Sequence, residues 1–249
     1  MSTSWESSHK WYDSIVGEKG HYYHEHVVLP NSLKLLHLQK GDSLLDLGCG
    51  QGILARSIPQ GVKYVGVDAS SSLIQSAKLK SKHPFYVSDI TKPLAILEKD
   101  FSHAAMILVT QNLENPAAAF QNTATHLQPG GKLLIVMNHP CFRIPRQSSW
   151  GIDEPKKLQY RRIDLYMSPL KIPIQTHPGK HEKSSTTFSF HHPLSYYIQN
   201  LSSAGFHIET IEEWISDKKS TGPKASMENR SRKEFPLFLA ILCSQQNNK

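Results

Sequence analysis

The sequence contains little cysteine and no long hydrophobic stretch. Its three cysteines, at positions 49, 141 and 243, are odd in number and far apart in the chain. This distribution argues against a disulfide framework and against a thiolate zinc site, and it favours a reducing cytoplasm. The longest apolar run, residues 235–243, contains a proline and is too short to span a bilayer, so no membrane partner is expected. The amino terminus lacks the basic and apolar regions of a signal peptide.

Charge is present but unevenly distributed. The 249 residues carry a formal net charge of +7. Residues 138–192 contain nine Lys and Arg against four acids, and residues 217–233 contain six against two. The summed net charge of these two basic segments exceeds the net charge of the whole chain, so the rest of the chain is slightly acidic. Each segment taken alone could simply be a solvated loop.

From residue 43 onward, short apolar segments alternate with amphipathic ones. This alternation predicts an α/β fold, in which helices cover a parallel sheet. Strands are expected at residues 43–47, 64–67, 85–88, 104–109 and 132–137, and helices at residues 53–58, 71–80, 93–97 and 116–127. No linker divides the chain, so residues 1–249 are expected to form a single domain.

The regions outside residues 43–137 follow other patterns. Residues 138–187 are rich in proline, basic residues and aromatics without clear periodicity, and are interpreted as an insertion that covers the substrate site. In residues 193–243, a helix at 193–204 is followed by strands at 206–214 and 234–243, which the basic loop 216–233 joins. Residues 1–40 have a helical period at 27–38 and are expected to form a helical lid.

The stretch SLLDLGCGQGI, residues 43–53, places three glycines directly after a predicted strand. Glycine lets the chain turn sharply and brings bare backbone close to a ligand. A dinucleotide site would have the spacing G-x-G-x-x-G, whereas Gly48, Gly50 and Gly52 occur at every second position, with Asp46 before them. A carboxylate there would repel a pyrophosphate and suits a cation, so a nicotinamide-binding domain is the weaker alternative.

Two further predicted strands end in an acid. Asp68 closes the strand VGVD, where it could accept hydrogen bonds from ribose hydroxyls. Asp89 and Ile90 follow the third strand, where they could accept from an exocyclic amine and pack on a purine face. Together with Asp46, these strand ends indicate an adenosine that has a cationic tail.

With these motifs the sequence resembles the class I S-adenosylmethionine-dependent methyltransferases. The matching segments are LLDLGCGQG, VGVD, SDI, AMILVTQNLENP, LQPGGKLLIVMNHPCF and FHHPLSYYIQNLSSAGF. The resemblance implies a Rossmann-like, doubly wound sheet of seven strands in the order 3-2-1-4-5-7-6. That sheet would be mostly parallel, with an antiparallel last strand and helices on both faces. The resemblance covers residues 44–137 and 193–243, and the remaining regions match no subfamily.

The resemblance also implies which residues bind S-adenosylmethionine. They lie at or beside the ends of the predicted strands: Asp46, Gly48, Gly50, Gly52, Asp68, Ala69, Asp89, Ile90, Thr110 and Gln111. Asp68 would hold the ribose hydroxyls, and Asp89 the adenine amine. Thr110 and Gln111 would lie beside the methionine tail and the methyl group.

Methyl transfer from a sulfonium requires alignment of the reactants rather than a protein nucleophile. A general base helps where the acceptor must lose a proton, and His139 is the catalytic candidate. His139 could instead only hydrogen-bond the loop that follows the fifth strand. Tyr22, His24 and Arg143 are candidates for contact with the substrate. The histidines near position 24 lack the spacing of a metal site, so no metal is expected.

Both basic segments are expected to leave the sheet at the edge where the parallel strands end, beside the predicted active site. A positive field there would concentrate negative substrates, so we expect a small anionic metabolite as the methyl acceptor. Two alternatives stay open. One is an RNA methyltransferase that uses the basic rim, and the other is an S-adenosylmethionine-binding protein without catalysis. Salt dependence would separate RNA binding from the rest.

Overall fold

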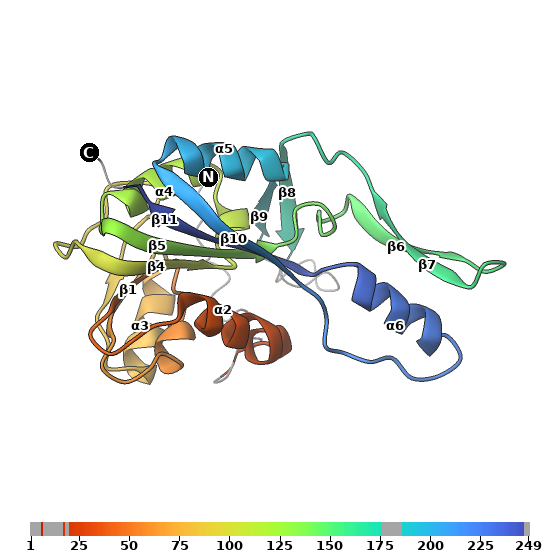
Figure 1. Cartoon of the computed structure of the whole chain (residues 1–249), viewed down its shortest axis with the longest axis horizontal. Helices are drawn as coiled ribbons and strands as arrows, with labels where there is room; N and C mark the ends of the chain where they lie inside the picture. The colour runs from red at the N-terminus through yellow and green to blue at the C-terminus, as the bar shows by residue number, and fades with distance from the viewer. Residues whose placement is uncertain (1–5, 7–16, 18–19, 176–185, 247–249) are drawn as a thin grey trace.

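The computed structural model describes residues 6, 17, 20–175 and 186–246. A sheet runs through the centre of the protein, with helices on both faces (Figure 1). The described strands are β1 (Ser43–Leu47), β2 (Lys63–Asp68), β3 (Phe85–Val87), β4 (Phe101–Ile107), β5 (Leu127–Asn138), β6 (Ser148–Asp153), β7 (Leu158–Ile163), β8 (Leu170–Gln175), β9 (Thr186–His191), β10 (Phe206–Trp214) and β11 (Phe238–Gln245).

Along the chain, most of the described helices lie between two strands of the central sheet. They are η2 (His24–Val28), α2 (Leu29–Leu36), η3 (Leu54–Arg56), α3 (Ser71–Lys80), η4 (Thr110–Asn112), α4 (Pro116–Ala124), α5 (Leu194–Ser203) and α6 (Ala225–Glu234). Here η2 is a π-helix, and η3 and η4 are short 3-10 helices. Each helix in this part of the chain is too short or too polar to cross a membrane.

Seven of the described strands form the central sheet, in the order β10-β11-β5-β4-β1-β2-β3. The strands from β3 to β5 pair in parallel, and β11 runs antiparallel to both β5 and β10. With β10 counted as the sixth strand and β11 as the seventh, the predicted order 3-2-1-4-5-7-6 is confirmed. Because β10 is parallel to β5, the connection from β10 to β11 leaves the sheet at the carboxyl edge.

Two hydrophobic cores lie on opposite faces of this sheet. Side chains alternate along a strand, so Leu44 of β1 packs into the core beneath α2 and α3, and Leu45 packs into the other. That second core includes Phe120 of α4 and Leu201 of α5 (Figure 1). β1 is covered on both faces, which explains why it reads as an almost continuous apolar run.

The helix boundaries follow local capping chemistry. Ser70 Oγ accepts a hydrogen bond from the backbone N–H of Leu73 at 3.2 Å and begins α3, and Asn115 caps α4 in the same way. The predicted helix at residues 93–97 is wrong, because no helix forms there. A five-residue segment is too short to offset the cost of helix nucleation. The predicted helix at residues 53–58 shortens to the single turn η3.

The insertion contains most of two antiparallel strand pairs, β6–β7 and β8–β9, and β9 continues past the predicted end of the insertion at residue 187 to His191. The hairpin β6–β7 projects from the body together with α6 (Figure 1), and Ser231 of α6 lies 3.3 Å from the carbonyl of Gln159 in β7. We call β6–β7 and α6 the basic arm. The sequence predicted a loop at residues 216–233, which is wrong because it contains most of α6. The residues of this helix are mostly polar, so it has no hydrophobic period to detect.

The first forty residues are described only in part. Residues 1–5, 7–16 and 18–19 lie outside the described residues, so the predicted lid cannot be followed along its length. From His24 the π-helix η2 continues directly into α2. The Tyr22 hydroxyl donates to Asp217 at 2.9 Å, and the Tyr23 hydroxyl lies 3.0 Å from Ser216 Oγ. This part of the chain therefore contacts the connection between β10 and β11.

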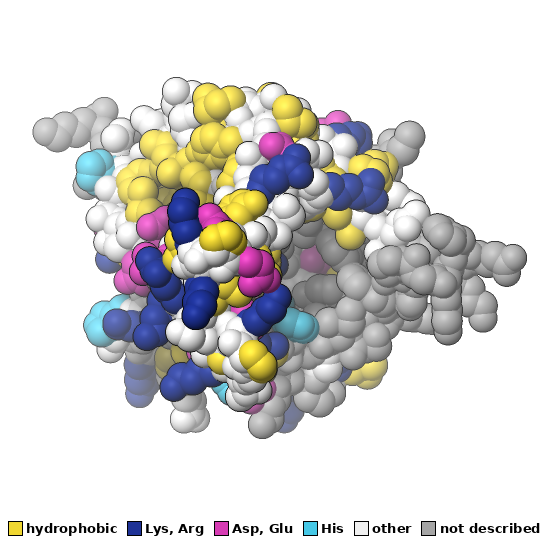
Figure 2. All heavy atoms as spheres, turned by 90° about the vertical axis from the view of Figure 1, so that its right-hand side faces the viewer, with side chains coloured by type: hydrophobic (Ala, Val, Ile, Leu, Met, Phe, Trp, Pro, Cys, Tyr) yellow, Lys and Arg dark blue, Asp and Glu magenta, His cyan; other side chains and the backbone are white. Residues whose placement is uncertain are grey.

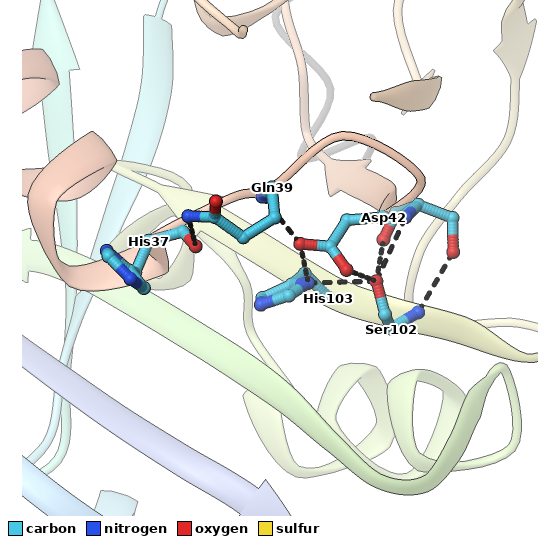
Figure 3. Close-up of polar contacts among 6 residues, drawn as sticks. His37, Gln39, Asp42, Ser102 and His103 are labelled. Atoms are coloured by element: carbon cyan, nitrogen blue, oxygen red, sulfur yellow. Dashed lines mark hydrogen bonds and ion pairs between the residues drawn. The ribbon is translucent and has the colours of Figure 1, made fainter. Parts of the chain in front are cut away.

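A polar cluster lies at the opposite edge of the sheet, where β1 and β4 begin (Figure 3). Ser102 Oγ is 2.9 Å from His103 Nδ1, and Asp42 lies 3.9 Å from the same nitrogen. Serine, histidine and aspartate side chains together can form a catalytic site, but here Ser102 Oγ is used in a contact between strands. It accepts a hydrogen bond from the backbone N–H of Ser43 at 2.9 Å. The backbone N–H of Ser102 donates in return to Ser43 Oγ. We therefore assign the cluster a structural role, which is to join β1 to β4.

Candidate active site

A cavity of about 290 Å³ lies at the carboxyl edge of the sheet. Gly48 and Gly50 line it after β1, and Asp68 lines it at the end of β2. Residues 107–109 and 111–112 contribute the wall after β4. Ile174 of β8 and Ser189 of β9 also line the cavity, so the insertion supplies part of the wall.

The turn after β1 can be made without strain only if its first position is glycine. Gly48 has a φ of +76°, and a Cβ atom there would lie 2.3 Å from Cγ2 of Val109. Gly52 also has a positive φ, but a Cβ there would approach the ring of Phe85. Gly48 therefore allows the turn to contact the exit of β4, whereas Gly52 accommodates core packing beside β3.

The carboxylate of Asp68 joins the glycine turn to α3. It accepts hydrogen bonds from the backbone N–H of Gly50 at 3.0 Å and from that of Ser70 at 2.8 Å. Burial raises the pKa of Asp68, and these two N–H groups oppose the rise. Glu6 lies close by, because Ser70 Oγ donates to its carboxylate at 2.6 Å. The hydroxyls of Ser70 and Ser72 lower the pKa of Glu6 to about 2.

Asp46 is buried beneath the turn and does not line the cavity. Only 2% of its surface is exposed, and the Tyr64 hydroxyl donates to it at 2.6 Å. Burial raises the pKa of Asp46 to about 7, although the Tyr64 hydrogen bond opposes the rise. A buried acid with this pKa is protonated in a substantial fraction of molecules at neutral pH. Its predicted proximity to the cofactor tail stays a prediction.

Asp46 should make the stability of the protein depend on pH. Its folded pKa of about 7 exceeds the unfolded value of about 3.9, so the native state binds the extra proton between these values. Stability from this group is present at low pH and is lost as pH rises to about 7. We expect Asp46→Asn to gain stability over the wild type by about 1.4 kcal/mol per pH unit in this range.

Urea denaturation of both proteins at several values between pH 5 and pH 8 measures this difference. The matched control is Asp100→Asn, because Asp100 is exposed and its φ of +61° suits asparagine. A difference between Asp46→Asn and the wild type that does not change with pH would contradict the assignment.

The exit of β4 contains polar atoms without partners. Gln111 donates through Nε2 to the carbonyl of Leu108 at 2.9 Å, which leaves its buried Oε1 with no donor among the described residues. The buried Thr110 Oγ1 also has no partner there. Leu108 lines the cavity with a φ of +57°, which is rare outside glycine. Such backbone strain occurs often at functional sites, and nothing in the sequence indicated it.

His139 is engaged at both of its ring nitrogens. Nε2 lies 2.7 Å from the carboxylate of Glu213, and Nδ1 accepts a hydrogen bond from the backbone N–H of Cys141 at 3.2 Å. Burial lowers the pKa of His139, and Glu213 opposes the shift. The geometry therefore favours the alternative in which His139 organises the loop after β5. Its catalytic role stays a prediction.

The three substrate candidates occupy different positions. His24 lines the main cavity, its Nδ1 has no partner among the described residues, and burial lowers its pKa to about 4. Arg143 lines a smaller cavity of about 20 Å³. Tyr22 lines neither cavity and stacks on His26, with ring centroids 4.3 Å apart. In the described part of the chain, no group of three His, Cys, Asp or Glu residues could hold a metal.

The predicted adenine-binding residues lie outside the cavity wall. Asp89 accepts hydrogen bonds from the backbone N–H and the hydroxyl of Thr91, and it pairs with Lys92. Ile90 is 4% exposed and packs into the hydrophobic core. Ala69 adjoins Asp68 but does not line the cavity. Asn138, by contrast, lines both cavities. It stands in the segment LQPGGKLLIVMNHPCF, although its role could not be read from that segment.

Comparison with known proteins places this chain in a methyltransferase family. Residues 19–168 match a family model described as a methyltransferase domain. A ubiquinone biosynthesis O-methyltransferase of Coxiella burnetii is 34% identical over 118 residues, which are 44% of this chain and 50% of the relative. The match thus spans only half of that relative.

Solved structures share the fold. An S-adenosylmethionine-dependent methyltransferase from Mesorhizobium loti superposes with a TM-score of 0.68 and 22% identity, covering 89% of this chain and 99% of that one. A glycopeptide N-methyltransferase solved with S-adenosylmethionine gives a TM-score of 0.56 and 14% identity over 86% of this chain and 92% of that one. At these identities the similarity concerns the fold.

Proposed function

We propose that this chain, which belongs to the methyltransferase domain family, transfers a methyl group from S-adenosylmethionine to a small anionic metabolite. The resemblance to class I methyltransferases seen in the sequence is confirmed. The nature of the acceptor is the part that we propose. It is supported by the charge around the cavity and by the residues in its wall.

The cavity fits S-adenosylmethionine in several respects. Gly48 and Gly50 present bare backbone, Asp68 offers carboxylate oxygens to a ribose, and Gln111 offers an acceptor without a donor among the described residues. When bound there, S-adenosylmethionine would supply the methyl group of its sulfonium to a lone pair of the acceptor, and the electrons of the broken carbon–sulfur bond would stay on sulfur. The protein would orient the acceptor and exclude water.

The position of the positive charge is the observation that carries the proposal. Figure 2 looks onto the end of the protein where the basic arm projects, and it shows Lys and Arg side chains gathered there. The arm is linked to the region around the cavity. Arg161 Nε of β7 donates to the carbonyl of Phe142 at 2.8 Å, and the next residue, Arg143, lines the smaller cavity. Such a field would concentrate anionic acceptors.

His24 is the better placed of the two histidines to receive a proton from the acceptor. It lines the main cavity, and its pKa of about 4 keeps the ring neutral at physiological pH. Both nitrogens of His139 are occupied by other groups. We therefore propose that His24 Nδ1 accepts a hydrogen bond from the acceptor, and that the proton passes from there to solvent.

RNA is the second candidate acceptor, and the basic arm is the observation that favours it. A ribbon of two strands with cationic side chains and the exposed Trp150 and Tyr160 could follow a phosphate backbone. Affinity would then fall steeply with salt concentration, because binding would release counterions. A small metabolite that pairs with one or two cations would respond far less.

The decisive experiment offers both acceptor classes to the purified protein with S-adenosylmethionine tritiated in the methyl group. One reaction contains a metabolite extract, and a parallel reaction contains bulk RNA. We expect label in small, anion-exchange-retained products and little change over moderate salt concentrations. Incorporation into RNA alone, with a steep loss at higher salt, would overturn the proposal and leave the methyltransferase assignment intact.

A further inference from the structure

The smaller cavity adjoins the main one. It measures about 20 Å³ and shares Gln111, Asn138, Pro145 and Ser189 with the wall of the main cavity. A group in the smaller cavity would therefore lie next to the space that Gly48 and Asp68 also line. An acceptor could extend from one cavity into the other.

Arg143 gives the smaller cavity a positive charge that no described protein anion balances. Its guanidinium is half-buried and lies 5.6 Å from the ring centroid of Phe238. In the described part of the chain, no carboxylate lies within ion-pair distance of it, and no oxygen accepts a hydrogen bond from it. Burial lowers the pKa of Arg143, and Arg161 adds repulsion, but arginine stays charged in proteins. A partly buried cation of this kind favours an anionic ligand.

The size of the cavity limits which anion can enter. About 10–15 Å³ of such volume holds one water molecule, so a cavity of about 20 Å³ admits only a small terminal group. A planar carboxylate meets this limit and matches the fork of donors on arginine. A phosphate group is bulkier in every direction and would have to displace the walls.

Gln111 sets a second requirement for the ligand of the smaller cavity. It lines both cavities, and the bond from its Nε2 to Leu108 fixes the orientation of its amide. Its buried Oε1 has no donor among the described residues. A buried acceptor is normally satisfied, so a ligand should present an O–H or N–H group there.

We infer that the methyl acceptor is a small carboxylate that carries a hydroxyl or amino group. Its carboxylate binds Arg143 in the smaller cavity, and its O–H or N–H donates to Gln111 Oε1 at the junction of the two cavities. This inference rests on the proposed function, because it defines the anion that the enzyme would methylate. It excludes phosphate monoesters as preferred acceptors.

Methyl transfer and binding are tested with defined probes. The probes are glycine, lactate and 4-hydroxybenzoate, each compared with its methyl ester, together with glycerol 3-phosphate. Binding is measured by calorimetry on the full chain saturated with S-adenosylhomocysteine, and methyl transfer by tritium incorporation. We expect at least one free carboxylate to bind, and its ester and the phosphate to bind about tenfold more weakly or worse.

Variants of Arg143 test the position of the carboxylate. Arg143→Gln should weaken binding of the carboxylate by about tenfold to a hundredfold, and Arg143→Lys should weaken it less. Lys63→Gln is the matched control, because Lys63 is exposed at the start of β2, outside the basic arm and outside both cavity walls. It should change binding by no more than about twofold, because exposed single charges contribute little.

The outcomes separate this inference from the proposed function. Equal binding by the wild type and Arg143→Gln, preference for the phosphate, or binding of no carboxylate at all would overturn the inference. If S-adenosylmethionine is bound in those cases, the cofactor assignment still holds. A protein that labels only RNA would instead overturn the proposed function.

Discussion

Replacement of Asp68 by alanine is expected to weaken S-adenosylmethionine binding by about 100-fold, because hydrogen bonds to a charged group contribute about 1.5–3 kcal/mol each. The carboxylate lines the main cavity and is held by the backbone N–H groups of Gly50 and Ser70. This leaves lone pairs on both oxygens for the ribose hydroxyls. The substitution removes those acceptors and also releases the glycine turn. Calorimetry with S-adenosylmethionine measures the loss.

Two further variants make the result specific. Asp68→Asn keeps one carbonyl oxygen, so its affinity for S-adenosylmethionine should lie between those of the wild type and Asp68→Ala. Asp89→Ala removes a carboxylate at the neighbouring strand end, outside the cavity wall, and should lose less affinity than Asp68→Ala. Thermal unfolding without cofactor shows whether each variant is folded. Affinity of folded Asp68→Ala equal to that of the wild type would show that the cofactor lies elsewhere.

Gly48→Ala is expected to destabilise the protein by about 2–5 kcal/mol, which combines the cost of a left-handed residue with that of overpacking. The φ of Gly48 is +76°, and the new Cβ would lie 2.3 Å from Val109 Cγ2. Val109 cannot yield easily because it belongs to the tight exit of β4 that also lines the cavity. The free energy of unfolding in urea measures the effect.

The two contributions can be separated with other variants. Gly205 has a φ of +83°, and a Cβ added there would meet nothing within 4 Å, so Gly205→Ala should cost only about 1–2 kcal/mol of backbone strain. Adding Val109→Ala to Gly48→Ala removes Cγ1 and Cγ2 of Val109 but keeps its Cβ, which would lie 2.8 Å from the new Cβ, so only part of the lost stability should be recovered. If Gly48→Ala costs no more than Gly205→Ala, the contact with Val109 is not tight.

The strands of the central sheet could be predicted because their signals are local. Residues 43–47 and 64–67 are apolar runs that end in an acid or a glycine turn, and the structure places β1 and β2 there. Parallel strands that are buried on both faces need such runs. The helices α3 and α4 were also predicted, and the structure shows that Ser70 and Asn115 cap them.

The hairpins and the basic arm could not be predicted in the same way. β6–β7 is exposed on much of its surface, so its sequence does not alternate cleanly between apolar and polar residues. α6 is polar on most sides and is held by contacts with distant residues, such as Ser231 with Gln159. Stability that comes from contacts between distant segments leaves little pattern in either segment alone.

The position of Asp46 shows a limit of motif-based reasoning. The motif correctly located a strand, a turn and an acid, and it suggested that this acid faces the cofactor tail. The structure buries Asp46 beneath the turn, with a hydrogen bond from Tyr64 of the neighbouring strand, and the proximity of Asp46 to the cofactor tail stays a prediction. The residues that the Asp46 carboxylate contacts depend on the register of β1 against β2. This register is a property of the assembled sheet.

By itself, the sequence determined the fold and the methyltransferase family, and it predicted the end of the sheet at which the cofactor would bind. Periodicity, turns and caps depend on near neighbours in the chain, so a single sequence displays them. Only the tertiary structure decided that Arg143, Gln111 and Asn138 share one small cavity and that His139 is occupied by Glu213. Gln111, residues 138–143 and Glu213 are far apart in the chain, and the order β10-β11-β5-β4 in the sheet brings them together.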